Sequence, residues 1–523
     1  MKKMLPLLLG CLLGLPAIAQ VTFSEDIAPI LYDNCTSCHR DGNIAPFPLV
    51  TYDDAVGYAA SIKNAVEKGE MPPWPPDTTF QRYAHERLLT PQEKNDLISW
   101  IDNGTPEGDT TKLPPLPDYP DGSVLGTPDL QLKIPKYTSQ ASTTDEYKCF
   151  YLATQLPVDR KVQAIEILPG NREIVHHVLV YVGDSSSAPV DSSCKTQGLK
   201  LMTGYTPGAG PTIFPHGTSV KMGMTLPAGA VILLQIHYPA GTQGMMDETA
   251  VNFFFYPENE TNVREVSADA ILQNWTLFIP ANTEKDYTAQ YPSGSSTIPY
   301  NFSVLSVFPH MHLIGTRIES YAVDGQNDTI PFSRIPDWDF DWQGFYNFKK
   351  IVKLPAGSKM YANAHYDNTT ANPHNPSNPP KLVTAGEATT DEMFLVYFHY
   401  LLYQAGDEYL DLDSLLDIPT AVAPDQPERT GTLQAFPNPS SGNVRWEFDA
   451  VHTGDHTLDV YTVDGKRVRS WRFSGLKAGH HVLPWNGHDE QGNHLPPGIY
   501  LGVLRSAQGS QVTRVAIVPG GGN

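Results

Sequence analysis

Cysteine, basic side chains and long apolar runs are all scarce in this sequence of 523 residues. Five cysteines are too few to serve as the main staple of a chain this long. Acidic residues outnumber basic ones 57 to 36, which argues against a nucleic-acid partner, because phosphate binding needs a basic face. Beyond the first 20 residues, no stretch is long and apolar enough to span a membrane.

The N-terminus has the features of an export signal. Lys2 and Lys3 precede an apolar run, residues 4–15, and a small-x-small cleavage pattern lies at residues 17–19. A lipoprotein signal ending at Cys11 remains an alternative. We therefore expect residues 1–19 to be removed and the protein to be exported, either secreted or at the cell surface, with the periplasm as the fallback.

Composition predicts several domains, most of them rich in β-structure. The length suggests three or four domains at roughly 150 residues each. Proline is frequent, at 46 residues, and charged residues make up only 18% of the chain. Pro-rich stretches suggest linkers at 113–128 and 416–430, which separate a helical segment (20–112), a β-rich middle (129–415) and a tail (431–523).

The segment 20–112 has three helical patterns, which begin after Ser24, Thr51 and Thr90. The third pattern has Pro91 in its first position and Glu93 to close a capping box. These features predict a small all-α domain.

Cys35 and Cys38, followed directly by His39, lie between the first two of these helices. Two thiols at this spacing attach the haem vinyl groups, and the adjacent imidazole becomes an iron ligand. A structural zinc site would usually need a second cysteine pair, and a thioredoxin-like redox pair would need a βαβ context. The sequence has neither feature around this pair. We favour Met71 as the sixth ligand, with His85 as the alternative. The segment resembles the small cytochrome c domains of bacterial exported proteins, which implies one covalent haem and an external electron donor.

Five histidines lie within apolar β-like runs of the middle region: His176, His177, His237, His310 and His312. Burying an imidazole is costly unless it is hydrogen-bonded or ligated. On a strand, residues i and i+2 share a face, which suits the last two histidines, whereas the adjacent first pair would need a bulged or twisted edge. Met393 adds a soft thioether, which favours redox copper over zinc.

Positions 145–405 resemble the copper type II, ascorbate-dependent monooxygenases, the peptidylglycine and dopamine hydroxylases. The matching strings, in order, are DEYKC (145–149), LPVD (156–159), VHH (175–177), IHY (236–238), PHMH (309–312) and DEM (391–393). The resemblance implies two tandem, jelly-roll-like β-sandwich domains, 129–262 and 263–415, each with one copper and with a solvent-filled cleft between them.

The resemblance also assigns roles to residues. It implies that His176, His177 and His237 bind the electron-transfer copper, and that His310, His312 and Met393 bind the copper where O2 is activated. A disulfide between Cys149 and Cys194, already the economical pairing in an oxidising compartment, matches one in the family's first copper domain.

Departures from the family pattern bear on the substrate. The peptide-amidating members have an arginine where this chain has Phe308, and an asparagine where it has Leu395. The tyrosine that follows, Tyr397, persists and is a candidate catalytic residue. We therefore expect an apolar or aromatic small molecule, and not peptidylglycine, as the substrate.

The tail resembles the Ig-like C-terminal sorting domain of the type 9 secretion system. The strings behind this resemblance are FPNP (436–439), LDVYTVDG (458–465), WNG (485–487) and PGIY (497–500). It implies the secretion machinery as a partner, and a carbohydrate- or protein-binding β-sandwich is the alternative.

Taken together, these features predict an exported copper-dependent monooxygenase supplied with electrons by its own haem. The alternatives are a copper-binding or sensing protein without turnover, and a haem–copper electron-transfer protein. We expect ordinary packing for His365, His399 and the Trp-rich stretch 337–342; the alternatives are that either histidine borders the second copper site and that the stretch lines a substrate mouth. We expect surface positions for His216 and the tail histidines: His452, His456, His480, His481, His488 and His494.

Overall fold

The computed structural model describes residues 20–43, 45–117, 119, 122–184, 194, 196, 198–217, 220–386, 388–415, 433–440, 442–450, 453–462, 466–477, 479–506 and 509–518. The predicted signal (1–19), the second linker (416–430) and His452 lie outside these residues. The chain divides into two compact units, 1–422 and 423–523. Most elements are strands, so the predicted β-rich architecture with a small helical part is confirmed at that level.

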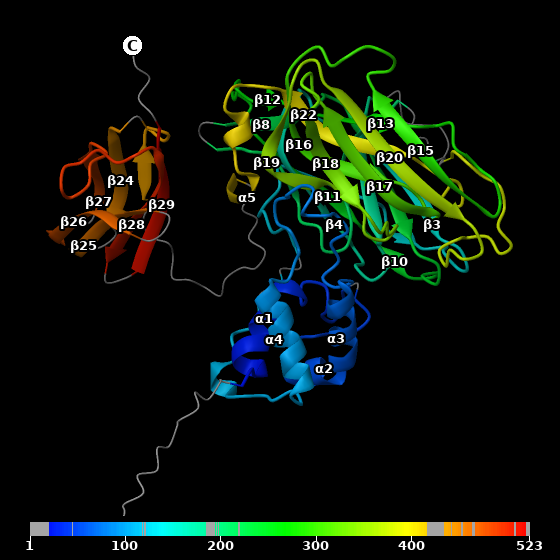
Figure 1. The fold of residues 1–523 in the computed structure, drawn as a ribbon, viewed down its shortest axis with the longest axis horizontal. Helices are drawn as coiled ribbons and strands as arrows, with labels where there is room; N and C mark the ends of the chain where they lie inside the picture. Colours follow the sequence, from blue (N-terminus) through cyan, green and yellow to red (C-terminus); the bar gives the residue numbers. More distant parts are fainter. Residues whose placement is uncertain are drawn as a thin grey trace, which may run out of the picture. The chain divides into compact units, whose positions relative to one another are not determined.

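The helices at the start of the first unit gather into a bundle (Figure 1). They are η1 (Phe23–Ile27), α1 (Ala28–Asn34), α2 (Tyr52–Gly57), α3 (Ala59–Lys68) and α4 (Pro91–Asp102), followed by η2 (Thr110–Lys112). Thr90 and Glu93 form the expected capping box at the start of α4. Phe23, Leu31 and Trp100 are buried in the bundle core.

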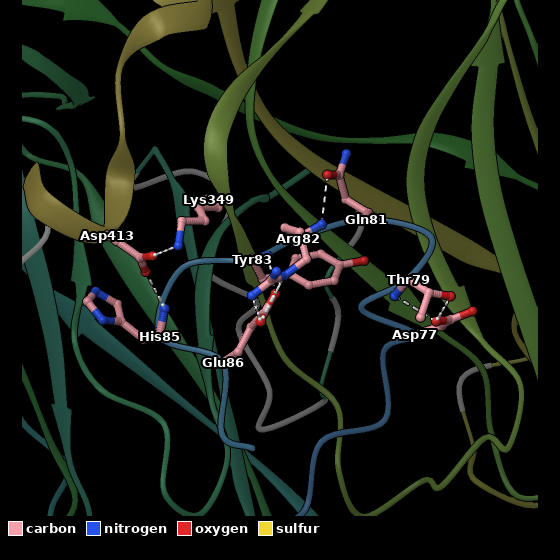
Figure 2. A network of polar contacts seen from close by, with 9 residues as sticks. All are labelled: Asp77, Thr79, Gln81, Arg82, Tyr83, His85, Glu86, Lys349 and Asp413. Atoms are coloured by element: carbon pink, nitrogen blue, oxygen red, sulfur yellow. Dashed lines mark hydrogen bonds and ion pairs between the residues drawn. The ribbon is translucent and has the colours of Figure 1, made fainter. Parts of the chain in front are cut away.

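The segment between α3 and α4 leaves the bundle and lies against the β-rich middle of the chain (129–415), which we call the β-region. We call residues 77–87 the docking segment. Backbone bonds tie it to two strands: Asp77 N–H donates to Arg334 O (2.8 Å) and Ala84 N–H to Asn347 O (2.8 Å). Tyr83 is fully buried and its hydroxyl donates to Phe332 O (2.9 Å). Figure 2 shows its neighbours, with His85 N–H directed at Asp413 Oδ1 (2.8 Å). Part of the expected haem segment therefore packs on the β-region.

Two sheets follow the helical bundle and enclose one core. The first has the order β1-β11-β4-β8-β12, with β7 beside β4, and the second has the order β3-β9-β5-β6. Val162 and Phe253 of the first sheet meet Val178 and Ile236 of the second in this core. The strands are β1 (Leu130–Lys133), β3 (Glu146–Ala153), β4 (Arg160–Leu168), β5 (His177–Gly183), β6 (Lys200–Tyr205), β7 (Thr212–Ile213), β8 (Met222–Leu226), β9 (Val231–Tyr238), β11 (Ala250–Phe255) and β12 (Arg264–Glu265), with a small pair β2 (Tyr137–Thr138) and β10 (Met246–Asp247).

Two further four-stranded sheets carry the rest of the β-region, in the orders β13-β22-β16-β19 and β15-β20-β17-β18. Their strands are β13 (Ser267–Gln273), β15 (Thr283–Tyr291), β16 (Phe302–His310), β17 (Gly315–Val323), β18 (Thr329–Ile335), β19 (Tyr346–Leu354), β20 (Lys359–Asn368) and β22 (Leu395–Leu402), with the pair β14 (Phe278–Ile279) and β21 (Val383–Thr384) and, after them, η4 (Asp407–Tyr409) and α5 (Leu412–Leu415). Leu305, Leu401 and Leu412 also join the core of the preceding sheets. We call the strands β1–β12 the first β-module and the strands β13–β22 the second β-module. The two β-modules therefore share part of one hydrophobic core.

The second unit is a separate two-sheet domain (Figure 1). One sheet has the order β23-β24-β27 and the other β26-β25-β28-β29. The strands are β23 (Gln434–Phe436), β24 (Val444–Ala450), β25 (Gly454–Thr462), β26 (Arg467–Leu476), β27 (Gly479–Trp485), β28 (Gly498–Ser506) and β29 (Gly509–Ile517). Trp446, Val460 and Val515 fill its core.

Candidate metal centres

Three histidines meet at one end of the β3-β9-β5-β6 sheet, and we call them centre 1: His176, His177 and His237. Register explains two of them, because His177 on β5 lies directly opposite His237 on β9, which puts their side chains on one face. His176 precedes the first residue of β5, and its N–H donates to His237 O (3.0 Å). No bulge is therefore needed, since the strand begins between the two neighbouring histidines.

The Nδ1 atoms of centre 1 converge. His177 Nδ1 lies 3.3 Å from that of His237 and 3.5 Å from that of His176. Burial lowers the pKa of His176 to about 4 and, with the neighbouring His237, holds the pKa of His177 well below its usual range. These two imidazoles are therefore neutral near pH 7, and neutral imidazole is the form that binds a metal.

Carboxylates lie behind the converging nitrogens. Asp145 Oδ2 is 3.1 Å from His237 Nε2, although off the hydrogen-bonding direction, and Asp341 Oδ1 is 3.5 Å from His176 Nε2. Tyr147 stacks flat on His237, with ring centroids 4.5 Å apart. A carboxylate behind a ligating imidazole is a common feature of metal sites. This donor set fits one metal ion.

His310 and His312 form the second cluster, with ring centroids 5.1 Å apart. The expected i, i+2 placement on one strand is wrong, because β16 ends at His310 and His312 lies two residues beyond it, just before a turn. Each Nδ1–H donates to a protein oxygen: His310 to Gln343 Oε1 (2.6 Å) and His312 to Asp391 O (3.1 Å). Neither Nε2 atom has a hydrogen-bond partner among the described residues, and burial lowers the pKa values of His310 and His312 to about 4 and about 3.

Met393 lies beside this cluster in the backbone trace. His310 pairs with Leu395 at the end of the β16–β22 ladder, so the residues just beyond, His312 and Met393, leave the sheet at the same end. We call His310, His312 and Met393 centre 2. Two imidazoles and a thioether form a soft donor set that suits copper.

Glu392 holds the two segments of centre 2 together. Its carboxylate is completely buried and accepts backbone N–H groups from His312 (2.8 Å), Ile314 (2.9 Å) and Met393 (3.1 Å). Burial raises the pKa of Glu392 to about 8, although these N–H groups favour the charged form. The carboxylate therefore fixes the backbone on both sides of the candidate ligands.

A small cavity lies between the centres. Its lining includes His177 from centre 1 and His310 from centre 2, together with Phe308 and Phe345. Its volume is about 20 Å³, room for about one water molecule. Gln343, Gly344 and Phe345, from the loop 336–345, also line this cavity.

The cysteine pair follows α1 directly. Cys35 and Cys38 are free thiols, and the backbone N–H groups of Cys38 and His39 both donate to Cys35 O (3.1 and 2.9 Å). His39 Nδ1–H donates to Phe47 O (3.0 Å), which leaves Nε2 available. Two free thiols beside such a histidine fit a covalent haem. Met71 is half-buried just after α3, whereas His85 is exposed on the docking segment.

Other predicted residues have clear positions. The disulfide Cys149–Cys194 is confirmed. Tyr397 lies opposite Phe308 in the sheet, with ring centroids 5.8 Å apart. His399 is packed as expected: Ser306 Oγ–H donates to its Nδ1 (2.8 Å) and its Nε2–H to Met202 O (2.9 Å). His365 is paired with Asp286 (2.8 Å).

The surface histidines follow the prediction in part. His216, His480 and His494 are exposed, and His481 and His488 are partly exposed. The prediction for His456 is wrong: its side chain is buried and its Nδ1–H donates to Gly454 O (3.1 Å). This self-satisfied bond on β25 lets the ring pack inward.

Sequence reasoning missed the residues that support the ligands: Asp145, Asp341, Gln343, Glu392 and Phe340. Asp145 and Glu392 belong to the strings that carry the resemblance, which was a usable signal. The other three come from a loop joined to the centres only by the fold.

Two family models match parts of the chain. Residues 271–412 match the copper type II ascorbate-dependent monooxygenase C-terminal domain, and residues 438–510 match the FlgD Ig-like domain. The region of centre 2 is thus similar to a copper monooxygenase domain. This match supports copper and an oxygenase-type activity, and the second supports an Ig-like tail.

Comparisons with whole proteins add little. No curated protein matches the chain. Among solved structures, PorZ of the type-IX secretion system of Porphyromonas gingivalis is 16% identical over 16% of this chain and 11% of its own, with a TM-score of 0.14. Dimeric latent PorU from the same organism is 11% identical over 72% of this chain and 34% of its own, with a TM-score of 0.16. A Parabacteroides merdae β-glucuronidase is 14% identical over 45% of this chain and 27% of its own, with a TM-score of 0.13.

The chain spans about a third or less of each of these proteins. Among the described residues, no helix is long and apolar enough to cross a membrane.

Proposed function

We propose that this protein is an exported copper-dependent monooxygenase that hydroxylates a C–H bond of a small apolar molecule. The balanced reaction is R–H + O2 + two electrons + two protons, giving R–OH and water. The observation that carries the proposal is the pairing of two donor sets, one in each β-module. Copper bound there would supply the one-electron redox chemistry that O2 reduction requires.

Centre 1 is suited to electron transfer. Its three imidazoles are nearly all buried, with His237 and His177 at 3% and 8% exposure. Asp145 and Asp341 lie behind His237 and His176, next to the Nε2 atoms and away from the converging Nδ1 atoms. Small rearrangement on a change of redox state favours fast electron transfer.

Centre 2 is suited to substrate chemistry. His310 and His312 present Nε2 while Gln343 and Asp391 O hold their Nδ1–H groups. Met393 would complete the set with a thioether. Tyr397 stacks on Phe308, which lines the cavity next to His310, so the tyrosine orients the cavity wall.

The side chains around this cavity, which itself has room for about one water molecule, favour a neutral, apolar group next to centre 2. Phe308 occupies the position of the family's carboxylate-binding arginine, and Phe345 and Leu179 extend the same surface. Among the described residues that line the cavity, none is Lys or Arg. A peptide carboxylate would be buried without a partner there, which is costly. Micromolar binding of a peptide with a free C-terminal glycine would contradict this substrate class.

A haem held by Cys35, Cys38 and His39, with Met71 as sixth ligand, would supply single electrons from an external donor. The position of Cys38 supports this role. A Cβ added to Gly208 would come within 3.3 Å of Cys38 Sγ, so the thiol lies against the loop after β6. Tyr205 and Thr206, just before Gly208, line the cavity between the centres. The exposed position of His85 favours Met71 as the ligand.

The tail would direct export through the type 9 secretion machinery. Its Ig-like match and its separation as a compact unit support a detachable sorting domain at the cell surface. A chain that ends before residue 423 should accumulate in the periplasm. Normal secretion of this shortened chain would contradict the sorting role.

Metal analysis and O2 uptake test the proposed enzyme. The purified chain should hold two coppers and one haem, and should consume O2 only with an apolar substrate and a reductant. Met393→Ala should abolish hydroxylation but spare haem reduction, whereas Met246→Ala, a change at an exposed methionine of the first β-module, should keep both hydroxylation and haem reduction. Copper binding without substrate-dependent O2 uptake would identify a binding or electron-transfer protein instead.

A further inference from the structure

One loop contacts all five candidate histidine ligands. It joins β18 to β19, comprises residues 336–345, and includes the Trp-rich stretch noted in the sequence. At centre 2, Trp338 Nε1–H donates to His312 O (3.2 Å), and Gln343 Oε1 accepts from His310 Nδ1–H (2.6 Å). At centre 1, Asp341 Oδ1 lies 3.5 Å from His176 Nε2. The Phe340 ring lies beside His177, His237 and His312.

Phe340 lies between the two centres. Its ring centroid is 6.1 Å from that of His177, 6.3 Å from that of His237 and 6.0 Å from that of His312. The side chain is only 8% exposed. The ring is close to perpendicular to His177 and His312, an arrangement that aromatic groups favour. A shift of an imidazole at either centre therefore alters the packing of the same phenyl ring.

Gln343 connects this ring to the second centre through hydrogen bonds. Its side chain is 5% exposed; the amide N–H donates to Phe340 O (2.8 Å), and the amide oxygen accepts from His310. The orientation of His310 and the backbone position of Phe340 are thus set by one side chain. This chain of contacts is continuous from His310 to the rings of centre 1.

We propose that Phe340 and Gln343 are positioning residues that couple the two centres, so that filling one centre with copper strengthens binding at the other. The inference rests on the proposed function, because it requires both centres to bind copper. Its physical basis is that ligand rings fixed by a metal at one centre hold the loop, and the loop in turn holds the rings of the other. By linkage the effect is the same in both directions.

A mutant cycle on the full-length protein tests this coupling, with Cu(I) affinity measured by competition with a chelator. His237→Ala disables centre 1, and His312→Ala disables centre 2. In the otherwise native chain, each change should weaken Cu(I) binding at the opposite centre by about 5- to 150-fold, the usual range of coupling between sites. We call this fold-change in Cu(I) affinity at the opposite centre the cross-effect. When Phe340→Ala is also present, the cross-effect should fall to a factor of nearly one.

Matched variants keep the test specific. Phe302→Ala removes a ring at the opposite end of β16 from His310 and should leave the cross-effect intact. If Phe340→Ala fails to fold, Gln343→Met, which keeps the side-chain length but removes both hydrogen bonds, should reduce the cross-effect instead. A native chain without a cross-effect, or one that keeps it after loss of Phe340, overturns the coupling while leaving the enzyme intact. A chain that binds no copper overturns both proposals.

Discussion

The two candidate copper centres are built in different ways. At centre 1, strand register puts His177 opposite His237, and the Nδ1 atoms face one another with carboxylates behind. At centre 2, the histidines follow the end of a strand, and their Nδ1–H groups are held by an amide oxygen and a backbone oxygen. The first centre is therefore fixed by a sheet, and the second by loops joined around a buried carboxylate. We expect the first to be rigid and the second to adapt.

Removing one ligand from each centre gives the largest effect. His237→Ala and His312→Ala should each lower the saturating copper content from two to one, and both should abolish hydroxylation, because the reaction needs two electrons and a site for O2. Copper analysis and product formation measure this. The exposed His216→Ala is the control and should retain both. If either single variant kept full hydroxylation, its centre would have no part in the reaction.

The carboxylates behind centre 1 offer a finer comparison. Asp145→Asn should weaken copper binding at that centre by about 10- to 100-fold, as loss of an outer partner does, and leave centre 2 bound. Asp286→Asn removes a carboxylate from the non-ligand His365, 2.8 Å away, and should change neither affinity. Equal effects of the two variants on copper titrations would show that the position behind His237 has no special role.

Glu392→Gln tests the loop-built centre. A glutamine keeps the shape but turns an acceptor oxygen into a donor that opposes a backbone N–H, at a cost of about 1–3 kcal/mol in unfolding free energy. Urea unfolding measures this, and copper binding should weaken most at centre 2. Glu166→Gln is the matched control: this buried carboxylate, on a sheet that carries neither centre, accepts from Val124 N–H and Asn252. It should lower stability without changing copper affinity, and a similar loss of affinity in both would remove the special role of Glu392.

The sequence predicted the parts of the molecule that depend on local pattern. The β-rich middle, the capped helix at Thr90 and the Cys149–Cys194 bridge are all present. The five histidines were found because imidazoles in apolar runs are conspicuous. The geometry of the two centres could not be predicted, because it depends on where the strands end. β5 begins at His177 and β16 ends at His310, and sequence patterns rarely locate a strand end to within one residue.

Contacts between residues far apart in the sequence could not be predicted from local sequence patterns. Nothing near Gln343 in sequence points to His310, 33 residues away, and the Trp-rich stretch containing Phe340 was expected to pack rather than to line a substrate mouth. The docking segment was hidden for the same reason: Tyr83 looks like part of a helical domain, yet its hydroxyl bonds Phe332 O. Partners of this kind are fixed by tertiary structure alone.

His399 shows that burial alone does not make a histidine a candidate ligand. It is buried like the ligands, but both of its ring nitrogens are hydrogen-bonded within the protein. Burial lowers its pKa from 6.5 to about 4, so the unfolded chain takes up a proton first as the pH falls. Stability from a neutral His399 is therefore present above pH 6.5 and is lost progressively down to about pH 4. Between pH 7 and pH 5, the stability advantage of the native metal-free chain over His399→Gln should shrink by about 1–2 kcal/mol in urea unfolding. An advantage that stayed constant would mean that His399 is protonated in the folded state as readily as in the unfolded one, and so that burial does not keep it neutral.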